Sequence, residues 1–66
     1  MVDWNKYPET VPPDIWEYLV TTVGGKVDSD YWIHNWRAEQ NEWYSYGKHQ
    51  VKAWAEMPEP YKETDG

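Results

Sequence analysis

The sequence lacks cysteine entirely. Without cysteine the chain has no disulfide bonds and no thiolate metal ligands, and this composition fits a reducing compartment. It also lacks any apolar run near the roughly 20 residues that a membrane helix needs. Its N-terminus shows no basic region followed by an apolar stretch, which is the pattern of a signal peptide. We therefore expect a complete small cytoplasmic protein with no membrane contact.

Basic residues are scarce. Six Lys and Arg stand against twelve Asp and Glu, which gives a formal net charge of −6. A protein that binds a phosphate backbone needs a basic face, so we expect no direct contact with nucleic acid. The charge fits solubility or a basic partner. Acidic mimicry of nucleic acid is the weaker interpretation, because the carboxylates are spread along the whole chain among Lys and Arg.

Catalytic and metal-binding patterns are also missing. The only serines are Ser29 and Ser45, neither stands in a Gly-x-Ser-x-Gly motif, and the two histidines lie in different segments. Asp28 and Asp30 are spaced to share a strand face with His34, but this set is too small for a Mg²⁺ or Ca²⁺ site. We predict no enzyme activity, no cofactor and no metal.

What the sequence has in abundance is aromatic residues, namely six Trp and six Tyr, without Phe. Each such ring buries roughly 150–250 Å². A domain of this size buries only about 60% of the surface of its unfolded chain, so it needs unusually large core side chains. Aromatic side chains therefore take the place of disulfides in this chain.

The chain divides into a Pro-rich extended arm over residues 1–15, a β-sheet core over 16–57 and a Pro-containing acidic tail over 58–66. Aromatic and β-branched residues predict strands within the core. The predicted strands cover residues 16–22, 26–36, 43–46 and 51–57, with a connection over 37–41 and a turn over 47–50. The expected fold is mostly β: a small antiparallel meander of about four strands with extended Pro-rich N- and C-terminal arms.

The first two strands form the best-defined hairpin. Gly24 and Gly25 supply the positive φ angles of a two-residue loop. The resulting register places Trp16 opposite Ile33, Tyr18 opposite Tyr31, and Val20 opposite Ser29. This pairing gives the sheet one apolar face, which is the alternation typical of a half-buried antiparallel pair.

In that register Trp32 and Trp36 lie on the face opposite Tyr18, so both faces carry large rings. One interpretation has the second face covered by Trp4 and Tyr7 of the arm and by residues 58–61. The other leaves an exposed aromatic surface of the kind that anchors partner proteins.

For the exposed surface the candidate binding residues are Trp32, Trp36, Arg37, Trp43 and Tyr44. The preferred function is a non-catalytic protein that binds another protein. One alternative is a binder that sequesters a nucleotide-like small molecule between rings, with Arg37 on its phosphate. A self-complementary surface would instead give a homodimer.

The C-terminal run over residues 51–61 resembles the end of a phage and prophage domain family of unknown function. That family ends in a Val-x-x-Trp-Met-Pro-Leu-Pro-Glu-Pro-like stretch, which Val51, Trp54, Pro58 and Pro60 match, whereas Glu56 stands where the family has its first Pro. Further similarities lie at Trp4, at residues 7–9, 18–22 and 25–27, and at Trp43. The resemblance implies a phage accessory factor of uncharacterised role. Together with the small size, the acidity and the surplus of rings, it leads us to expect a factor in the cytoplasm of a bacterial host that binds a host protein, as an inhibitor or in counter-defence. A virion structural protein is a further alternative.

Overall fold

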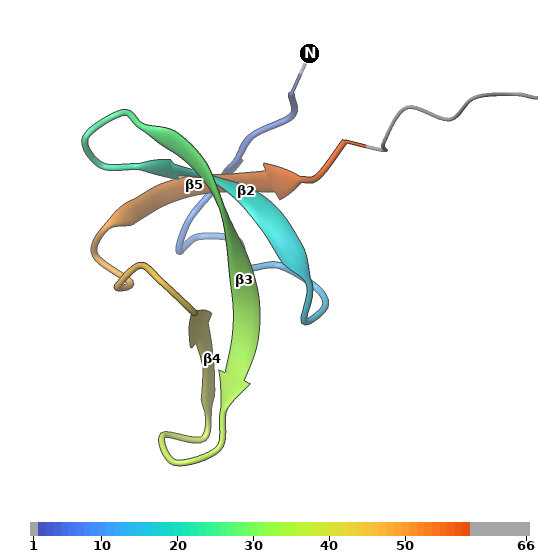
Figure 1. The fold of residues 1–66 in the computed structure, drawn as a ribbon, viewed down its shortest axis with the longest axis vertical. Coiled ribbons are helices and arrows are strands. Elements are labelled where there is room, and N and C mark those ends of the chain that lie inside the picture. Colours follow the sequence, from blue (N-terminus) through green and yellow to red (C-terminus); the bar gives the residue numbers. More distant parts are fainter. Residues whose placement is uncertain (1, 59–66) are drawn as a thin grey trace, which may run out of the picture.

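The structure is a computed structural model that describes residues 2–58. These residues form five antiparallel strands and no helix. The strands are β1 (Asn5–Lys6), β2 (Glu17–Thr22), β3 (Val27–Asn35), β4 (Gln40–Trp43) and β5 (Val51–Glu56). They make one curled open sheet in the order β1-β5-β2-β3-β4 (Figure 1). The predicted class, a small antiparallel β fold with an extended N-terminal arm, is confirmed.

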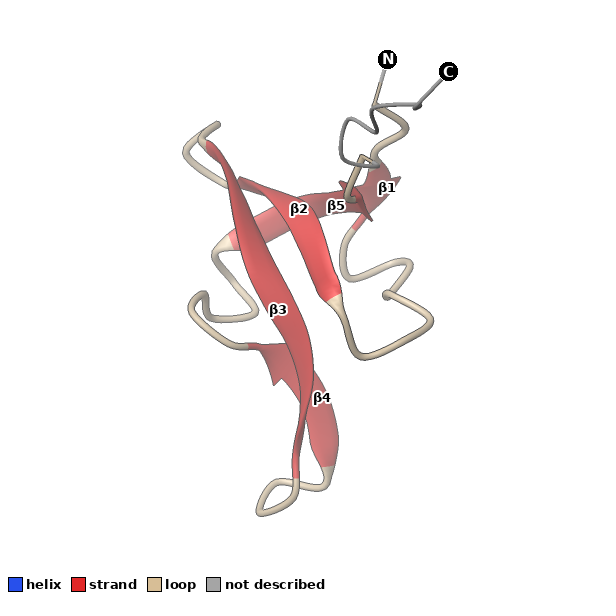
Figure 2. Cartoon of the chain, turned by 45° about the vertical axis from the view of Figure 1, so that its right-hand side comes forward, coloured by secondary structure: helices blue, strands red, loops and turns tan. Residues whose placement is uncertain are grey.

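Strand β5 pairs with β2 and not with β4, which corrects the meander order. Residues 44–50 carry the chain from the edge strand β4 back to the centre of the sheet (Figure 2). In β5, Trp54 lies opposite Val20 of β2, and its ring packs edge-on against Tyr18 with centroids 5.3 Å apart. Burial of this large ring explains the order, because β2 at an edge would leave its apolar side chains open to water.

The loop between β2 and β3 contains three residues instead of two. The amide of Thr22 donates to the carbonyl of Lys26 over 2.8 Å, and the amide of Gly25 donates back to the carbonyl of Thr22 over 2.8 Å. Gly25 has a φ of +89°, in the left-handed region. This pattern is that of a three-residue hairpin loop, which ends in a left-handed residue.

The extra loop residue moves the register by one position. Tyr18 pairs with Asp30 instead of Tyr31, and Val20 pairs with Asp28. Because side chains alternate between the two faces of a strand, a slip of one residue exchanges the faces of β3. Asp30 is consequently buried and Tyr31 exposed. The predicted register is therefore wrong, although the hairpin itself is present.

Strand β4 begins earlier than predicted. The side chain of Asn35 accepts hydrogen bonds from the amides of Arg37 and Ala38 over 3.0 and 3.2 Å. These bonds close a tight turn in which Glu39 has a φ of 53°. The predicted connection is thus a short turn, and residues 44–46, predicted as strand, have already left the sheet.

The core is built almost entirely of aromatic rings. Its members are Tyr7, Tyr18, Val20, Trp32, Trp43, Val51 and Trp54. The ring pairs meet edge to face, with centroids between 4.9 and 6.5 Å apart. Edge-to-face geometry stabilises aromatic pairs beyond the area that they bury.

The N-terminal arm joins the sheet through β1 and the core through Tyr7. The indole Nε1 of Trp54 donates to the carbonyl of Thr10 over 3.0 Å, and the hydroxyl of Tyr18 donates to the carbonyl of Asp14 over 3.1 Å. The arm therefore packs on the sheet, while Trp4 remains 40% exposed. The packing expected for Pro60 and Tyr61 lies outside the described residues.

Candidate functional site

Two of the five predicted binding residues, Trp32 and Trp43, are core residues. They lie opposite one another on β3 and β4, and each is 3% exposed. Their rings meet at 64° with centroids 4.9 Å apart. Their surface placement is wrong because the changed register turns this face of β3 inward. Neither indole Nε1 has a hydrogen-bond partner among the described residues. Both indole rings instead contact the Tyr7 ring edge to face, and an aromatic ring is a weak acceptor for an N–H group.

Trp36 and Arg37 lie at the tip of the hairpin formed by β3 and β4, which extends away from β1 and β5 (Figure 2). The Trp36 ring is 83% exposed and stands edge-on to the His34 ring, with centroids 4.4 Å apart. His34 is held in turn by a 2.8 Å hydrogen bond between Nδ1 and Oδ1 of Asn41. The tip thus presents a ring and a guanidinium, and their role in binding stays a prediction.

Tyr44 lies just beyond β4, where its amide donates to the carbonyl of Tyr31 over 2.9 Å. Trp43 is buried in the core, whereas Tyr44, the next residue, is 71% exposed and lies on the outer face. Tyr31 is exposed on that same face. The structure therefore separates the five predicted residues into a core pair, a hairpin tip and one residue of the outer face.

Beside Tyr31 lies a hollow of about 280 Å³. It is lined by Ile15, Trp16, Glu17, Tyr31, Trp32 and Ile33. Trp16 is 70% exposed and Tyr31 is 53% exposed, and Ile15 is also open to solvent. We call Ile15, Trp16, Tyr31 and Ile33 the Trp16 face.

Sequence reasoning missed the Trp16 face because the two-residue loop assigned Trp16 and Tyr31 to the core. A signal was present in the sequence. Val23-Gly24-Gly25 also suits a three-residue loop with Gly at its left-handed position. That loop alone would have turned Tyr31 outward.

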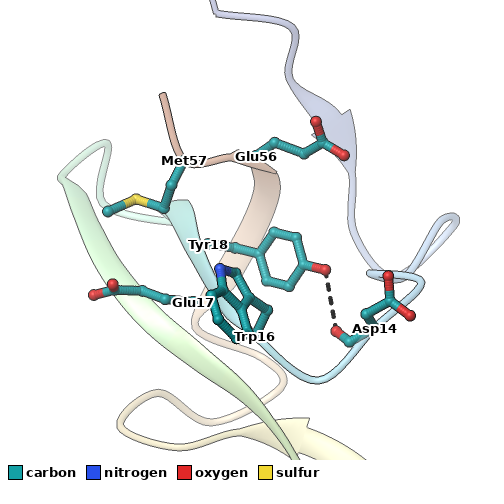
Figure 3. A pocket seen from close by; sticks show the side chains of 6 residues that line it. All are labelled: Asp14, Trp16, Glu17, Tyr18, Glu56 and Met57. Carbon is teal, nitrogen blue, oxygen red and sulfur yellow. Dashed lines mark hydrogen bonds between the residues drawn. The ribbon is translucent and has the colours of Figure 1, made fainter. Parts of the chain in front are cut away.

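A second hollow, of about 430 Å³, adjoins the first at Trp16 and Glu17. It is lined by Asp14, Trp16, Glu17, Tyr18, Glu56 and Met57 (Figure 3). Three of these six residues are acidic and none is basic. In Figure 3 the Trp16 indole lies beside the Tyr18 ring, whose hydroxyl is fixed by its bond to the Asp14 carbonyl. The second hollow thus combines an exposed indole with an excess of negative charge.

The carboxylates of Asp28 and Asp30 hold the fold together. The buried Asp30 carboxylate accepts from the amides of Tyr31, Ser45 and Tyr46 over 2.9 to 3.2 Å. The Tyr46 hydroxyl donates to Asp28 Oδ2 over 2.6 Å. Together these bonds tie the segment after β4 to β3. Within residues 2–58, no group of three His, Asp or Glu side chains is placed to hold a metal ion.

The contact between Tyr46 and Asp28 changes both pKa values. The hydroxyl bond, supported by the Ser29 amide and the charge of Lys26, lowers the pKa of Asp28. The same bond to a carboxylate raises the pKa of Tyr46. Burial raises the pKa of Tyr7. All three shifts belong to structural contacts and lie outside both hollows.

Among the described residues there is no helix long and apolar enough to cross a membrane. No protein-family model, curated protein or solved structure matches the chain. The resemblance of residues 51–61 to a phage domain family therefore stays a prediction, and the last part of that run lies outside the described residues.

Proposed function

We propose that the chain is a small non-catalytic protein that binds another protein through the Trp16 face. The observation that carries this proposal is the exposure of Trp16 and Tyr31 beside an apolar hollow. A small domain gains stability from each ring that it buries, and this one buries five aromatic rings while leaving Trp16 at the surface. Exposed aromatic clusters next to pockets are typical of the anchoring centres of protein interfaces.

The charges around the Trp16 face indicate the kind of partner. Asp14, Glu17 and Glu56 border the two hollows, and the whole chain carries a formal charge of −6. Opposite charges steer two proteins together and select against acidic partners. The partner surface is therefore basic around an apolar centre. In the phage hypothesis drawn from the sequence, this partner is a protein of the bacterial host.

The nucleotide-binding alternative relies on Trp36 and Arg37 at the hairpin tip. Neither residue lines either hollow, so a base stacked there would be held on one side only. Proteins usually enclose most of the surface of a small ligand. The geometry therefore favours a protein partner on the Trp16 face.

The test compares Trp16→Ala with Trp36→Ala, which removes another exposed indole outside both hollows. Each purified variant is immobilised and exposed to a bacterial lysate, and any retained protein is then purified and titrated by calorimetry. We expect Trp36→Ala to bind like the wild type and Trp16→Ala to lose at least tenfold in affinity, as at a binding hot spot. Wild-type binding by Trp16→Ala would refute the Trp16 face as the site, and a loss at Trp36→Ala alone would move the site to the hairpin tip.

A further inference from the structure

The two hollows differ in chemistry although they share Trp16 and Glu17. The smaller one is closed by the apolar side chains of the Trp16 face. The larger one adds two acidic residues, Asp14 and Glu56, together with Tyr18 and Met57. An extended segment that passes Trp16 can therefore reach both an apolar hollow and an acidic hollow.

The larger hollow suits a cation for two independent reasons. First, the face of an indole attracts ammonium and guanidinium groups more strongly than any other aromatic side chain does. Second, Asp14, Glu17 and Glu56 line the same hollow, and none of the described residues that line it is basic. A cation entering this hollow is thus attracted both by the ring and by the carboxylates.

The smaller hollow suits an aliphatic side chain. Ile15 and Ile33 line it together with the Tyr31 and Trp32 rings, and among residues 2–58 the one charged member of its lining is the shared Glu17. Its volume of about 280 Å³ is just below the size at which small-molecule pockets begin, and it leaves room for an aliphatic side chain.

We propose that the two hollows form one bipartite site for a peptide segment of the partner in which a Lys or Arg side chain neighbours an aliphatic one. The cationic side chain lies in the larger hollow against Trp16, and the aliphatic side chain lies in the smaller one. This inference rests on the proposed function and adds the chemistry of the segment that is bound. Charge complementarity selects this occupant over a second copy of the chain, because two copies with the same formal charge of −6 repel one another.

The test uses the ¹⁵N-labelled chain, whose Trp indole signals report each Trp separately. The first probe is N-acetyl-lysine N-methylamide, and its neutral control is N-acetyl-norleucine N-methylamide. We expect the lysine probe to shift the Trp16 indole signal in a saturable way while the Trp36 signal stays in place. Added salt should weaken this binding, because the carboxylates are near the surface.

Single charge removals locate the cation. Glu17→Gln and Glu56→Gln should each weaken the lysine probe by about two- to fivefold, as expected for exposed charge pairs. Glu9→Gln is the matched control, since Glu9 is an exposed acid of the arm outside both hollows. Equal affinities for the lysine and norleucine probes, or equal effects of all three variants, would overturn the cation site.

The second probe is a set of acetylated heptapeptides that carry one Lys and one Leu at spacings from adjacent to three apart. Peptides with both residues should bind more tightly than peptides in which Lys is replaced by norleucine or Leu by Ser. If norleucine peptides bind Trp16 as well as lysine peptides do, the bipartite site is refuted while a purely apolar Trp16 face survives. If no probe shifts the Trp16 signal and Trp16→Ala leaves partner binding intact, both proposals fail.

Discussion

Removal of the Asp30 carboxylate should destabilise the fold strongly. The side chain is 3% exposed and accepts from three amides, those of Tyr31, Ser45 and Tyr46. A hydrogen bond to a charged group contributes about 1.5–3 kcal/mol to stability. Without the carboxylate, water can bond the amide of the exposed Ser45, so the loss at this amide is smaller. We therefore expect Asp30→Ala to lower the free energy of unfolding by about 3–4 kcal/mol and Asp30→Asn by about 2 kcal/mol.

This loss is large relative to the total free energy of unfolding. At about 0.05–0.15 kcal/mol per residue, a chain of this length has a total stability of about 3–10 kcal/mol. Urea unfolding followed by circular dichroism measures the change, with Asp3→Ala as a control at an exposed aspartate. Hydrogen exchange adds a local measurement, since the amides of Ser45 and Tyr46 should exchange faster in Asp30→Asn. A loss below about 1 kcal/mol with unchanged exchange at these two amides would show that Asp30 does not hold the segment.

Three further predictions concern pH, the hairpin loop and the core. The pKa of Asp28 is lowered in the folded state, so this group stabilises the fold fully above its unfolded pKa of about 3.9. This stability is lost as the pH falls through the folded pKa. The pKa of Tyr46 is raised, so this group stabilises the fold fully below its unfolded pKa of about 10, and this stability is lost as the pH rises through the folded pKa. Tyr46→Phe removes the hydroxyl that shifts both pKa values, so it should flatten both ends of the curve of stability against pH. An unchanged curve would exclude the contact in solution. Gly25→Ala should lower the free energy of unfolding by about 1–2 kcal/mol, because the φ of Gly25 is +89°. Gly24→Ala should be nearly neutral, since the added Cβ meets only Thr22 Oγ1 at 3.8 Å. Equal melting temperatures of the two variants would contradict the three-residue loop. Trp43→Ala should lower the free energy of unfolding by about 3–5 kcal/mol and unfold much of the protein, which a thermal melt detects. A small effect would show that Trp43 is not a core residue in solution.

The sequence determined the class of the fold and the approximate place of most strands. Alternation and β-branched residues located β2, β3 and β5, and the glycine pair located the hairpin between β2 and β3. These features are local, because the preference for extended backbone and for a tight turn is set by neighbouring residues. The same reasoning correctly expected that aromatic rings would build the core.

Only the tertiary structure decided which rings are buried. Gly24 and Gly25 suit a loop of two or three residues, and the choice between them exchanges the faces of β3. Packing decides that choice, because the observed register places Trp32 against Trp43 and leaves Tyr31 outside. The pairing of β5 with β2 is likewise a long-range contact that no local pattern encodes. The candidate site depends on both, since Trp16, Tyr31 and Glu56 come together only after register and strand order are set.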